Sequence, residues 1–451
     1  MSIFIDKLDD SINDITVFHS NLHGDGVKAL KKINKNDVIF NEIPMCCLQS
    51  IPNRQDAICC SYCHQFIGSI DMQLKILKKE ITRKEVIDYM NQSKNSIDIL
   101  SHLILPCQSN CGTLYCSENC RDSHLTKSHK YLCTGNINDE DADSNCLVQF
   151  ILHAIETNEI FLLVADVFAR ICSDVDDGQT IENALKPWQG YCRNRWEEVA
   201  TTSDAEQTPE EFAETLKSLT QESWELLCDA FDLKSKNLDT ILDEDFMSRT
   251  IGMFEQNNVG VRLINPVLNY VKRVANNPDD VYESLLKDIK EISKNLEETD
   301  ACEWEDMDEN DDENDDENNE DDLEGNLEVN QTPFKSIFET PPTNPTLLEL
   351  EEILINDGID NLFPPLDGTA FYKTICKINH SCNPNCIVKY TSDSVHGLIA
   401  QVVALRDIEE GEEMVQSYID QSMDVFNRQS ALKDYGFQCL CIKCTDEINK
   451  S

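Results

Sequence analysis

The sequence predicts an α+β protein in which short strands are separated by a cysteine-rich finger and a long helical region. Short β-rich runs lie near both ends of the chain, within residues 14–48 and 398–418. Residues 145–250 instead place apolar side chains at helical spacing. Closely spaced cysteine pairs occur between these regions and again at residues 439–444. Such pairs in a chain of this length are typical of zinc ligands rather than disulfides.

Length and charge narrow the classes of function. The chain has 451 residues, enough for several domains, and a formal net charge of −46. An acidic body argues against direct nucleic-acid binding and suits attraction of basic protein segments, although solubility alone explains the charge equally well. The 21 cysteines are dilute, no signal peptide precedes them, and no apolar run is long enough to span a membrane. We therefore expect a protein of the nucleus or cytoplasm with no membrane segment.

The first strands are expected at residues 15–18, 27–30 and 37–40. The turn between the first two contains Gly24-Asp25-Gly26. Paired glycines allow a backbone to adopt positive φ and to approach a ligand closely. A plain hairpin turn explains them equally well.

A first metal-binding region is expected at residues 59–133. Eight candidate ligands in four pairs imply two zinc ions: Cys60 and Cys63, Cys107 and Cys111, Cys116 and Cys120, His129 and Cys133. His124 and Cys59 are competing ligands, and a RING-type ubiquitin ligase is the rival arrangement for such a cross-braced finger. Apolar residues at helical spacing predict a helical insert at about residues 68–104.

Helices are expected through residues 145–250, at 279–296, and from Leu347 to near Gly358. Thr208, Pro209 and Glu211 form a predicted capping box with proline at the first helical position. An acidic tract from Glu303 to Asp322 continues into a Pro/Thr-rich stretch. Like charges repel there and little is available to bury, so residues 301–344 are predicted to be disordered.

A second metal-binding constellation joins distant parts of the chain. Cys439, Cys441 and Cys444 lie within six residues and lack a fourth ligand. Cys382 can supply it, which would pin the C-terminal segment against the turn that contains Asn379 and His380. These two side chains offer hydrogen-bond donors and acceptors to a ligand.

The motifs together resemble a known family. Asn379-His380-Ser381-Cys382, Gly411-Glu412-Glu413, Ser417-Tyr418-Ile419-Asp420 and the final Cys-x-Cys-x2-Cys are similar to motifs of the SET-domain lysine methyltransferases. With the finger, they resemble the SET-and-MYND (SMYD) family, in particular the branch that includes the SMYD five and plant ATXR two proteins. The resemblance implies a SET-domain β-clip fold, split by a MYND finger and a helical insertion and followed by a zinc-bound post-SET tail.

The resemblance also implies domain boundaries. They are residues 14–48 for the N-terminal part of SET, 59–133 for the MYND finger with its insert, 145–250 for the helical insertion, 251–300 and 346–420 for the SET core, 301–344 for the acidic insertion and 421–447 for the post-SET segment. The family pattern assigns Cys60, Cys63, Cys116 and Cys120 to one zinc and Cys107, Cys111, His129 and Cys133 to another. Three structural zinc ions per chain are therefore expected.

Site residues follow from the same resemblance. Tyr418 is expected to be catalytic, orienting a lysine amine for in-line methyl transfer, and Tyr435 and Phe437 to line the lysine channel. Residues expected to contact S-adenosylmethionine are Gly24, Asp25, Gly26, Asn257, Asn379, His380, Tyr418 and Phe437. Asn258 is an alternative to Asn257 if the alignment shifts by one residue. Asp25 replaces the family's usual basic residue, which leaves the role of its side chain open.

The implied function is S-adenosylmethionine-dependent methylation of lysine in basic proteins, such as histones or ribosomal proteins. The alternative is a catalytically inactive SET scaffold whose MYND finger captures peptides, often Pro-rich ones. The retention of Asn379, His380 and Tyr418 favours the enzyme. The altered glycine turn keeps the alternative open.

Overall fold

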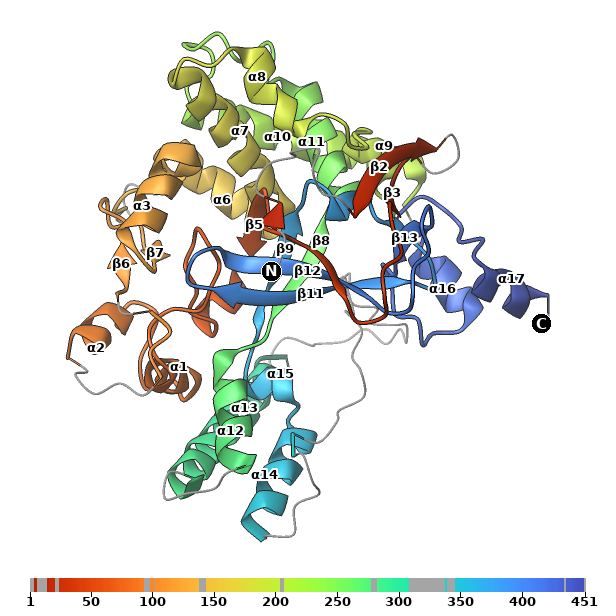
Figure 1. Cartoon of the computed structure of the whole chain (residues 1–451). Coiled ribbons are helices and arrows are strands. Elements are labelled where there is room, and N and C mark those ends of the chain that lie inside the picture. The colour runs from red at the N-terminus through yellow and green to blue at the C-terminus, as the bar shows by residue number, and fades with distance from the viewer. Residues whose placement is uncertain are drawn as a thin grey trace, which may run out of the picture.

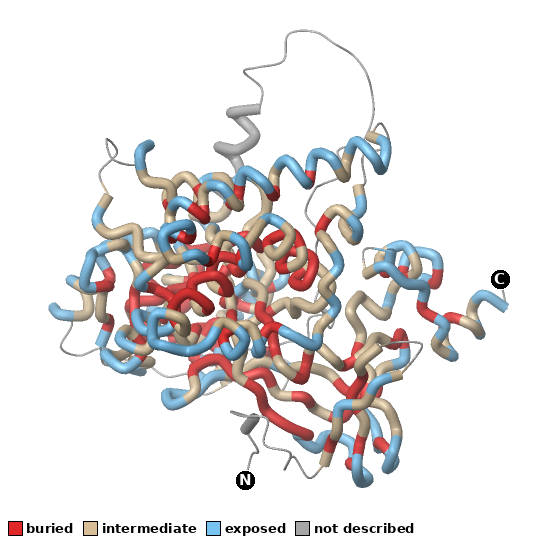
Figure 2. Tube along the Cα trace, turned by 90° about the horizontal axis from the view of Figure 1, so that it is seen from above, coloured by how far each residue is buried: buried red, intermediate tan, exposed pale blue. Residues whose placement is uncertain are grey.

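A computed structural model of the chain shows strands at its centre, with helical groups and a metal-ligand finger around them (Figure 1). The structure describes residues 4–5, 14–20, 24–92, 98–101, 103–137, 143–202, 207–276, 282–307, 337–338, 345–433 and 435–449. In Figure 2 the buried segments gather in the middle of the molecule, and the C-terminal segment lies at its edge. The predicted α+β class is confirmed.

One sheet joins the two ends of the chain. Its strand order is β1-β4-β12-β11, from Phe4–Ile5, Val38–Glu42, Gly397–Ala404 and Cys386–Asp393. β12 runs antiparallel to both β4 and β11, with a register irregularity between Val402 and Val403. The N-terminal strands therefore complete a sheet whose centre is built more than 350 residues later.

Two further sheets hold the predicted site. The order β10-β13-β3-β2 comes from Asn379–His380, Glu413–Gln416, Gly24–Ala29 and Ile15–Ser20. The order β5-β9-β8 comes from Cys46–Gln49, Leu366–Phe371 and Val259–Leu263. β10 pairs in parallel with β13, so the motif at Asn379 lies beside the strand that leads to Tyr418. Apolar side chains from all three sheets form one buried core, which includes Val27, Phe40 and Met414.

The helical region between the finger and β8 forms its own core against β5 and β9. Its helices are α6 Cys146–Thr157, α7 Ile160–Asp176, α8 Ile181–Leu185, η3 Lys186–Trp188, α9 Trp196–Val199, α10 Pro209–Ala230 and α11 Glu244–Asn257. The central helix α7 is buried along most of its length. The predicted capping box is present: the Thr208 hydroxyl accepts the Glu211 N–H, and the Glu211 carboxylate accepts the Thr208 N–H.

A second helical group packs on the opposite side of the sheets (Figure 1). It contains α12 Pro266–Asn276, α13 Tyr282–Met307, α14 Pro345–Asn356 and α15 Ile359–Leu362. α13 begins three residues later than predicted and continues to Met307, into the range predicted to be disordered. Residues 308–336 and 339–344 of that range lie outside the described residues.

The finger packs against both helical groups. Its elements are η1 Pro52–Gln55, α1 Ile70–Leu77, α2 Val86–Gln92, β6 Leu105–Pro106, β7 Leu114–Tyr115, α3 Glu118–His124, η2 Leu125–His129 and α4 Lys130–Leu132. The helical insert is thus present as α1 and α2. Ile70, Leu74 and Leu77 of α1 pack into the core of the second helical group.

The C-terminal segment folds as α16 Val425–Ala431 and α17 Ile442–Ile448, and the short helix η4 Ile375–Lys377 precedes β10. Among the helices in the described part of the chain, none combines the length and apolar character needed to cross a membrane.

Candidate functional site

The structure gathers the twelve predicted metal ligands into three groups of four. In each group all ligand atoms lie within 4.8 Å of one another. The groups are Cys60, Cys63, Cys116 and Cys120; Cys107, Cys111, His129 and Cys133; and Cys382, Cys439, Cys441 and Cys444. The eleven cysteines of these three groups are free of disulfides.

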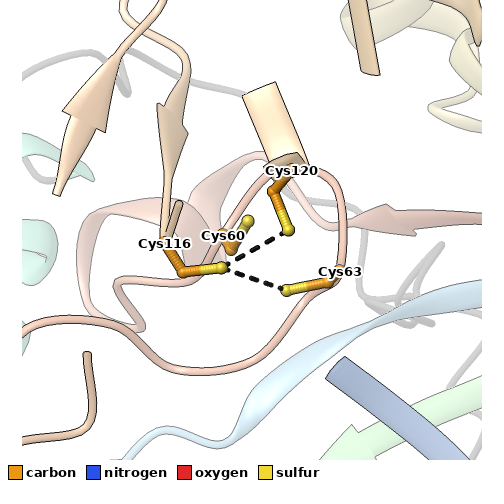
Figure 3. A group of neighbouring side chains, drawn as sticks. All are labelled: Cys60, Cys63, Cys116 and Cys120. Atoms are coloured by element: carbon orange, nitrogen blue, oxygen red, sulfur yellow. Dashed lines mark hydrogen bonds between the residues drawn. The ribbon is translucent and has the colours of Figure 1, made fainter. Parts of the chain in front are cut away.

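The first group has the geometry of a tetrahedral site (Figure 3). The Cys116 Sγ lies 3.7 Å from the Cys63 Sγ and 3.4 Å from the Cys120 Sγ. A tetrahedron with zinc–sulfur distances of about 2.3 Å has edges of about 3.8 Å. These thiols therefore fit a closed zinc site that has no open position for substrate.

The second group uses His129 rather than its competitor. The His129 Nε2 lies 3.3 Å from the Cys107 Sγ and 3.4 Å from the Cys111 Sγ. His124 instead places its Nδ1 3.1 Å from the Tyr115 hydroxyl. Burial lowers the pKa of His129, which favours the neutral imidazole that binds a metal. Cys59 packs into the core of the strands rather than joining either group.

The third group draws Cys382 to the C-terminal thiols, as predicted. The Cys382 and Cys444 Sγ atoms are 3.5 Å apart. The guanidinium of Arg428, which is 1% exposed, donates to the Cys444 Sγ at 3.6 Å and to the Glu447 carboxylate at 2.7 Å. A cation at this position offsets the negative charge that four thiolates bring to one divalent ion.

Tyr418 lies where this third group meets a cavity of about 200 Å³. Its hydroxyl donates to the Ile378 carbonyl at 2.8 Å, and its N–H donates to the His380 Nδ1 at 3.0 Å. Burial raises the pKa of Tyr418, so the phenol is protonated at neutral pH. The cavity is lined by Tyr418 and Tyr435, by Asn257 and Asn258, by Cys376 and Cys386, and by apolar residues of β11 such as Ile387 and Val388.

His380 connects the third group to Tyr418. Because its Nδ1 accepts the Tyr418 N–H, the neutral imidazole carries its proton on Nε2, which lies 3.3 Å from the Cys382 Sγ. The imidazole, predicted to hold a cofactor, therefore has both nitrogens engaged within the protein. An ion bound to Cys382 would thus be linked to the backbone of Tyr418 through one side chain.

The two aromatic residues predicted for the channel take different positions. Tyr435 lines the cavity, and its hydroxyl donates to the Tyr418 carbonyl at 3.5 Å. The Phe437 ring, 37% exposed, packs 5.8 Å from the His380 ring and 6.5 Å from the Tyr418 ring. Of these two residues, Tyr435 is among the described residues that line the cavity, and Phe437 is not.

The prediction of a turn at Gly24-Asp25-Gly26 is wrong, because these residues begin strand β3 and pair with β2. They lie against Asn379. The Asn379 amide donates to the Asp25 carbonyl at 3.3 Å and to the Glu413 carboxylate at 2.8 Å. A Cβ at Gly26 would lie 2.8 Å from that carboxylate and 3.0 Å from the Asn379 amide nitrogen. A side chain at Gly26 would therefore displace the Glu413 and Asn379 side chains, while Gly24 adopts a φ of +70°.

Asn257 ends helix α11 and borders the cavity beside Asn258. Its amide donates to the Met253 carbonyl at 2.7 Å and to the Cys192 carbonyl at 3.1 Å. Either alignment of this segment with the family therefore places an asparagine at the cavity.

Sequence reasoning missed two contributors to the site. The helical region sends the loop of residues 189–194 into it, where Tyr191 packs edge-on against Phe371 at 4.6 Å. Lys377 binds the same loop through the Gly190 carbonyl at 2.8 Å. The available signal was Gly190-Tyr191, one residue after Pro187-Trp188, because such residues in a loop often serve a site.

A buried carboxylate holds the segment on which Tyr418 rests. The Glu42 oxygens accept the N–H groups of Thr374 and Ile375 at 2.9 and 3.0 Å, at the start of η4. Burial raises the pKa of Glu42 to about 7, although these hydrogen bonds oppose the shift. Glu42 therefore fixes the turn that presents the Ile378 carbonyl to Tyr418.

Comparison with known proteins agrees with this geometry. Residues 196–419 match the SET domain family. The chain is 26% identical to the histone-lysine N-methyltransferase ATXR2 of Arabidopsis thaliana, over 96% of this chain and 91% of that protein. It is 42% identical to the N-lysine methyltransferase SMYD2 of Gallus gallus over 17% of each chain. It is also 36% identical to the SET domain and MYND-type zinc finger protein 6 of Schizosaccharomyces pombe, over 21% of this chain and 18% of that protein.

Proposed function

The chain belongs to the SET-domain protein-lysine methyltransferases, as a SMYD-like member, and from this premise we propose its reaction. We infer that it transfers a methyl group from S-adenosylmethionine to the Nζ of a lysine in a basic protein, such as a histone or a ribosomal protein. The observation that carries the proposal is the position of Tyr418, which lines a cavity and whose backbone N–H donates to the His380 imidazole.

The donor-binding groups would belong to β3 and β10, which both pair with β13. S-adenosylmethionine, when bound, supplies an electrophilic methyl group on a sulfonium. Gly24, Asp25, Gly26 and Asn379 lie together on β3 and β10 and would hold its amino-acid end. The Phe437 ring beside His380 offers an aromatic face, which favours a cationic centre.

The acceptor lysine must be neutral to react, and the cavity lining favours that form. A solvated lysine titrates near pH ~10.4, so roughly one in a thousand is neutral at pH 7. Cys376, Cys386, Ile387 and Val388 remove water from the entering side chain without offering a counter-ion. Burial among them disfavours the ammonium and raises the neutral fraction.

Tyr418 would aim the amine. Its single hydroxyl proton is already donated to Ile378, so the phenol oxygen is left as an acceptor. An amine N–H that donates to this oxygen is held in one orientation, with the nitrogen lone pair free to attack. Alignment of this kind lowers the barrier by several kcal/mol.

Three zinc ions would act as structural parts of this enzyme. The ion of Cys382, Cys439, Cys441 and Cys444 would fix Tyr435 and Phe437 beside Tyr418, because both aromatics lie on the short segment just before Cys439. The acidic body suits a basic protein substrate and residence in the nucleus or cytoplasm. The finger would additionally offer a surface to peptide ligands.

The test combines donor binding with labelled methyl transfer to histones and ribosomal proteins. Tyr418→Phe is compared with Tyr390→Phe, because the Tyr390 hydroxyl also donates to a backbone carbonyl, that of Gly260 at 2.6 Å, and Tyr390 lines the same cavity. We expect Tyr418→Phe to bind the donor normally and to lose about 100-fold in turnover. Tyr390→Phe should keep most activity.

The results of these measurements separate the proposed function from its alternatives. Absence of donor binding to the wild-type protein would refute the proposal. Equal losses in the two variants would remove the role of Tyr418. Donor binding without transfer to any basic protein would favour the inactive peptide-binding scaffold.

A further inference from the structure

An ion pair lies at the start of β3, at the residue whose side-chain role the family resemblance left open. The Lys377 Nζ is 2.6 Å from the Asp25 carboxylate, and the His19 Nδ1 lies 3.0 Å from the other oxygen of that carboxylate. The side chains of Asp25 and Lys377 are 35% and 15% exposed. Lys377 thus brings a cation to the start of β3, where Asp25 stands in place of a basic residue.

Lys377 is fixed in place by contacts from three directions. Besides Asp25, its ammonium donates to the Gly190 carbonyl at 2.8 Å and lies 4.8 Å from the centre of the Tyr191 ring. The start of β3, the loop of residues 189–194 and η4 therefore meet at the Lys377 ammonium. A lysine held this way loses little further conformational freedom when a ligand arrives, which favours selective binding.

The pair lies at the group of residues proposed to hold the amino-acid end of the donor. Lys377 is two residues before Asn379, and the Asn379 amide donates to the Asp25 carbonyl. The amino-acid end of S-adenosylmethionine is a zwitterion, with one carboxylate and one ammonium on the same carbon. A fixed Asp-Lys pair carries the same two charges in a form that can face it in antiparallel fashion.

Resting on the proposed function, we propose that Asp25 and Lys377 together recognise this zwitterion. The Lys377 ammonium faces the donor carboxylate, and the Asp25 carboxylate faces the donor ammonium. Lys377 is then a specificity residue, and the pair replaces the single basic side chain that the family places between the glycines.

The charge state of the pair agrees with this role. Burial alone would raise the pKa of Asp25, but the hydrogen bonds from Lys377 and His19 outweigh it and hold that pKa below its usual value. Asp25 is therefore ionised throughout the physiological range. The same contacts would also form if the pair only held β3 in place. The experiment must therefore separate ligand recognition from positioning of β3.

The experiment compares three ligands on the full chain. S-adenosylmethionine carries both charges, its decarboxylated analogue lacks the carboxylate, and methylthioadenosine lacks the whole amino-acid end. Dissociation constants are measured by calorimetry for the wild-type protein and for Lys377→Met, Asp25→Asn and Lys389→Met. Lys389 is an exposed lysine of β11 that serves as the charge-matched control. Thermal unfolding verifies that each variant is folded.

Recognition of the zwitterion predicts a change in ligand preference. Lys377→Met should weaken S-adenosylmethionine about tenfold and leave the decarboxylated analogue and methylthioadenosine within about twofold of wild type. Asp25→Asn should weaken the two ligands that carry the ammonium and spare methylthioadenosine. Lys389→Met should change none of the three.

Two outcomes would overturn the inference. If Lys377→Met weakened all three ligands by a common factor, Lys377 would only position the start of β3. The proposed function would then stand without this inference. If the wild-type protein bound methylthioadenosine and S-adenosylmethionine with equal affinity, the pair would contribute nothing to recognition. Failure of the wild-type protein to bind any of the ligands would refute the proposed function itself and the inference with it.

Discussion

Replacing Gly397 with alanine tests whether the finger supports the strands that line the cavity. Gly397 begins β12 directly after the turn that joins it to β11, and it has a φ of +71°. A Cβ there would lie 2.2 Å from the Cys63 carbonyl oxygen and 2.4 Å from the Cys63 Cβ. The next residue, Leu398, donates its N–H to that same carbonyl at 2.7 Å. The hairpin therefore rests directly on a metal-ligand residue of the finger.

Two costs add in this variant. Alanine in the left-handed region costs about 1 kcal/mol relative to glycine. Forcing a methyl group into a packed contact costs a further 1–3 kcal/mol, roughly, because backbone rather than a flexible side chain must move. The free energy of unfolding should thus fall by about 2–4 kcal/mol. Gly411→Ala is the matched control, since Gly411 has a φ of +83° and nothing within 4 Å of the added Cβ. It should cost only about 1 kcal/mol.

Urea unfolding of both variants, monitored by circular dichroism, gives the comparison. Elemental analysis then shows whether zinc bound at Cys63 is lost along with stability. Equal destabilisation by the two substitutions would refute the reasoning, because it would mean that the hairpin does not press on the finger. A loss confined to Gly397→Ala would show that the finger is an integral part of the SET fold.

Three further predictions concern other parts of the molecule. The pKa of Glu42 is about 7 in the folded chain against an ordinary 4.5, so its contribution to stability is present below pH 4.5 and is lost as the pH rises through 7. Relative to Glu42→Gln, the wild-type protein should therefore lose about 3 kcal/mol of unfolding free energy over that range, and a pH-independent difference in urea titrations would contradict this. Cys444→Ser should reduce zinc from about three to about two per chain and abolish methyl transfer; retention of three zinc ions in elemental analysis would exclude a third site at this position. Thr208→Ala should cost about 1 kcal/mol in urea unfolding by removing the cap of α10, whereas no change would show that this helix end does not contribute to stability.

Local sequence was sufficient wherever spacing alone decides the structure. The capping box at Thr208 and Glu211 is present because its partners lie three residues apart. The two ligands within each closely spaced pair were predictable for the same reason, because they lie only a few residues apart. The family pattern supplied the pairing between distant pairs, and the structure brings those same sets together. The side-chain roles of Tyr418 and Asn379 came from the resemblance and stay predictions.

Contacts between distant segments were decided only by the tertiary structure. No local signal links Lys377 to Asp25, 352 residues away, because the register between β10, β13 and β3 sets that distance. The loop at Gly190 enters the site only because α11 and η4 pack against it. His129 was predicted ahead of His124 as the ligand, and the structure turns His129 toward the thiols and His124 toward Tyr115. Spacing along a chain fixes which neighbours can meet, whereas burial of the sheets and helices selects which distant side chains do.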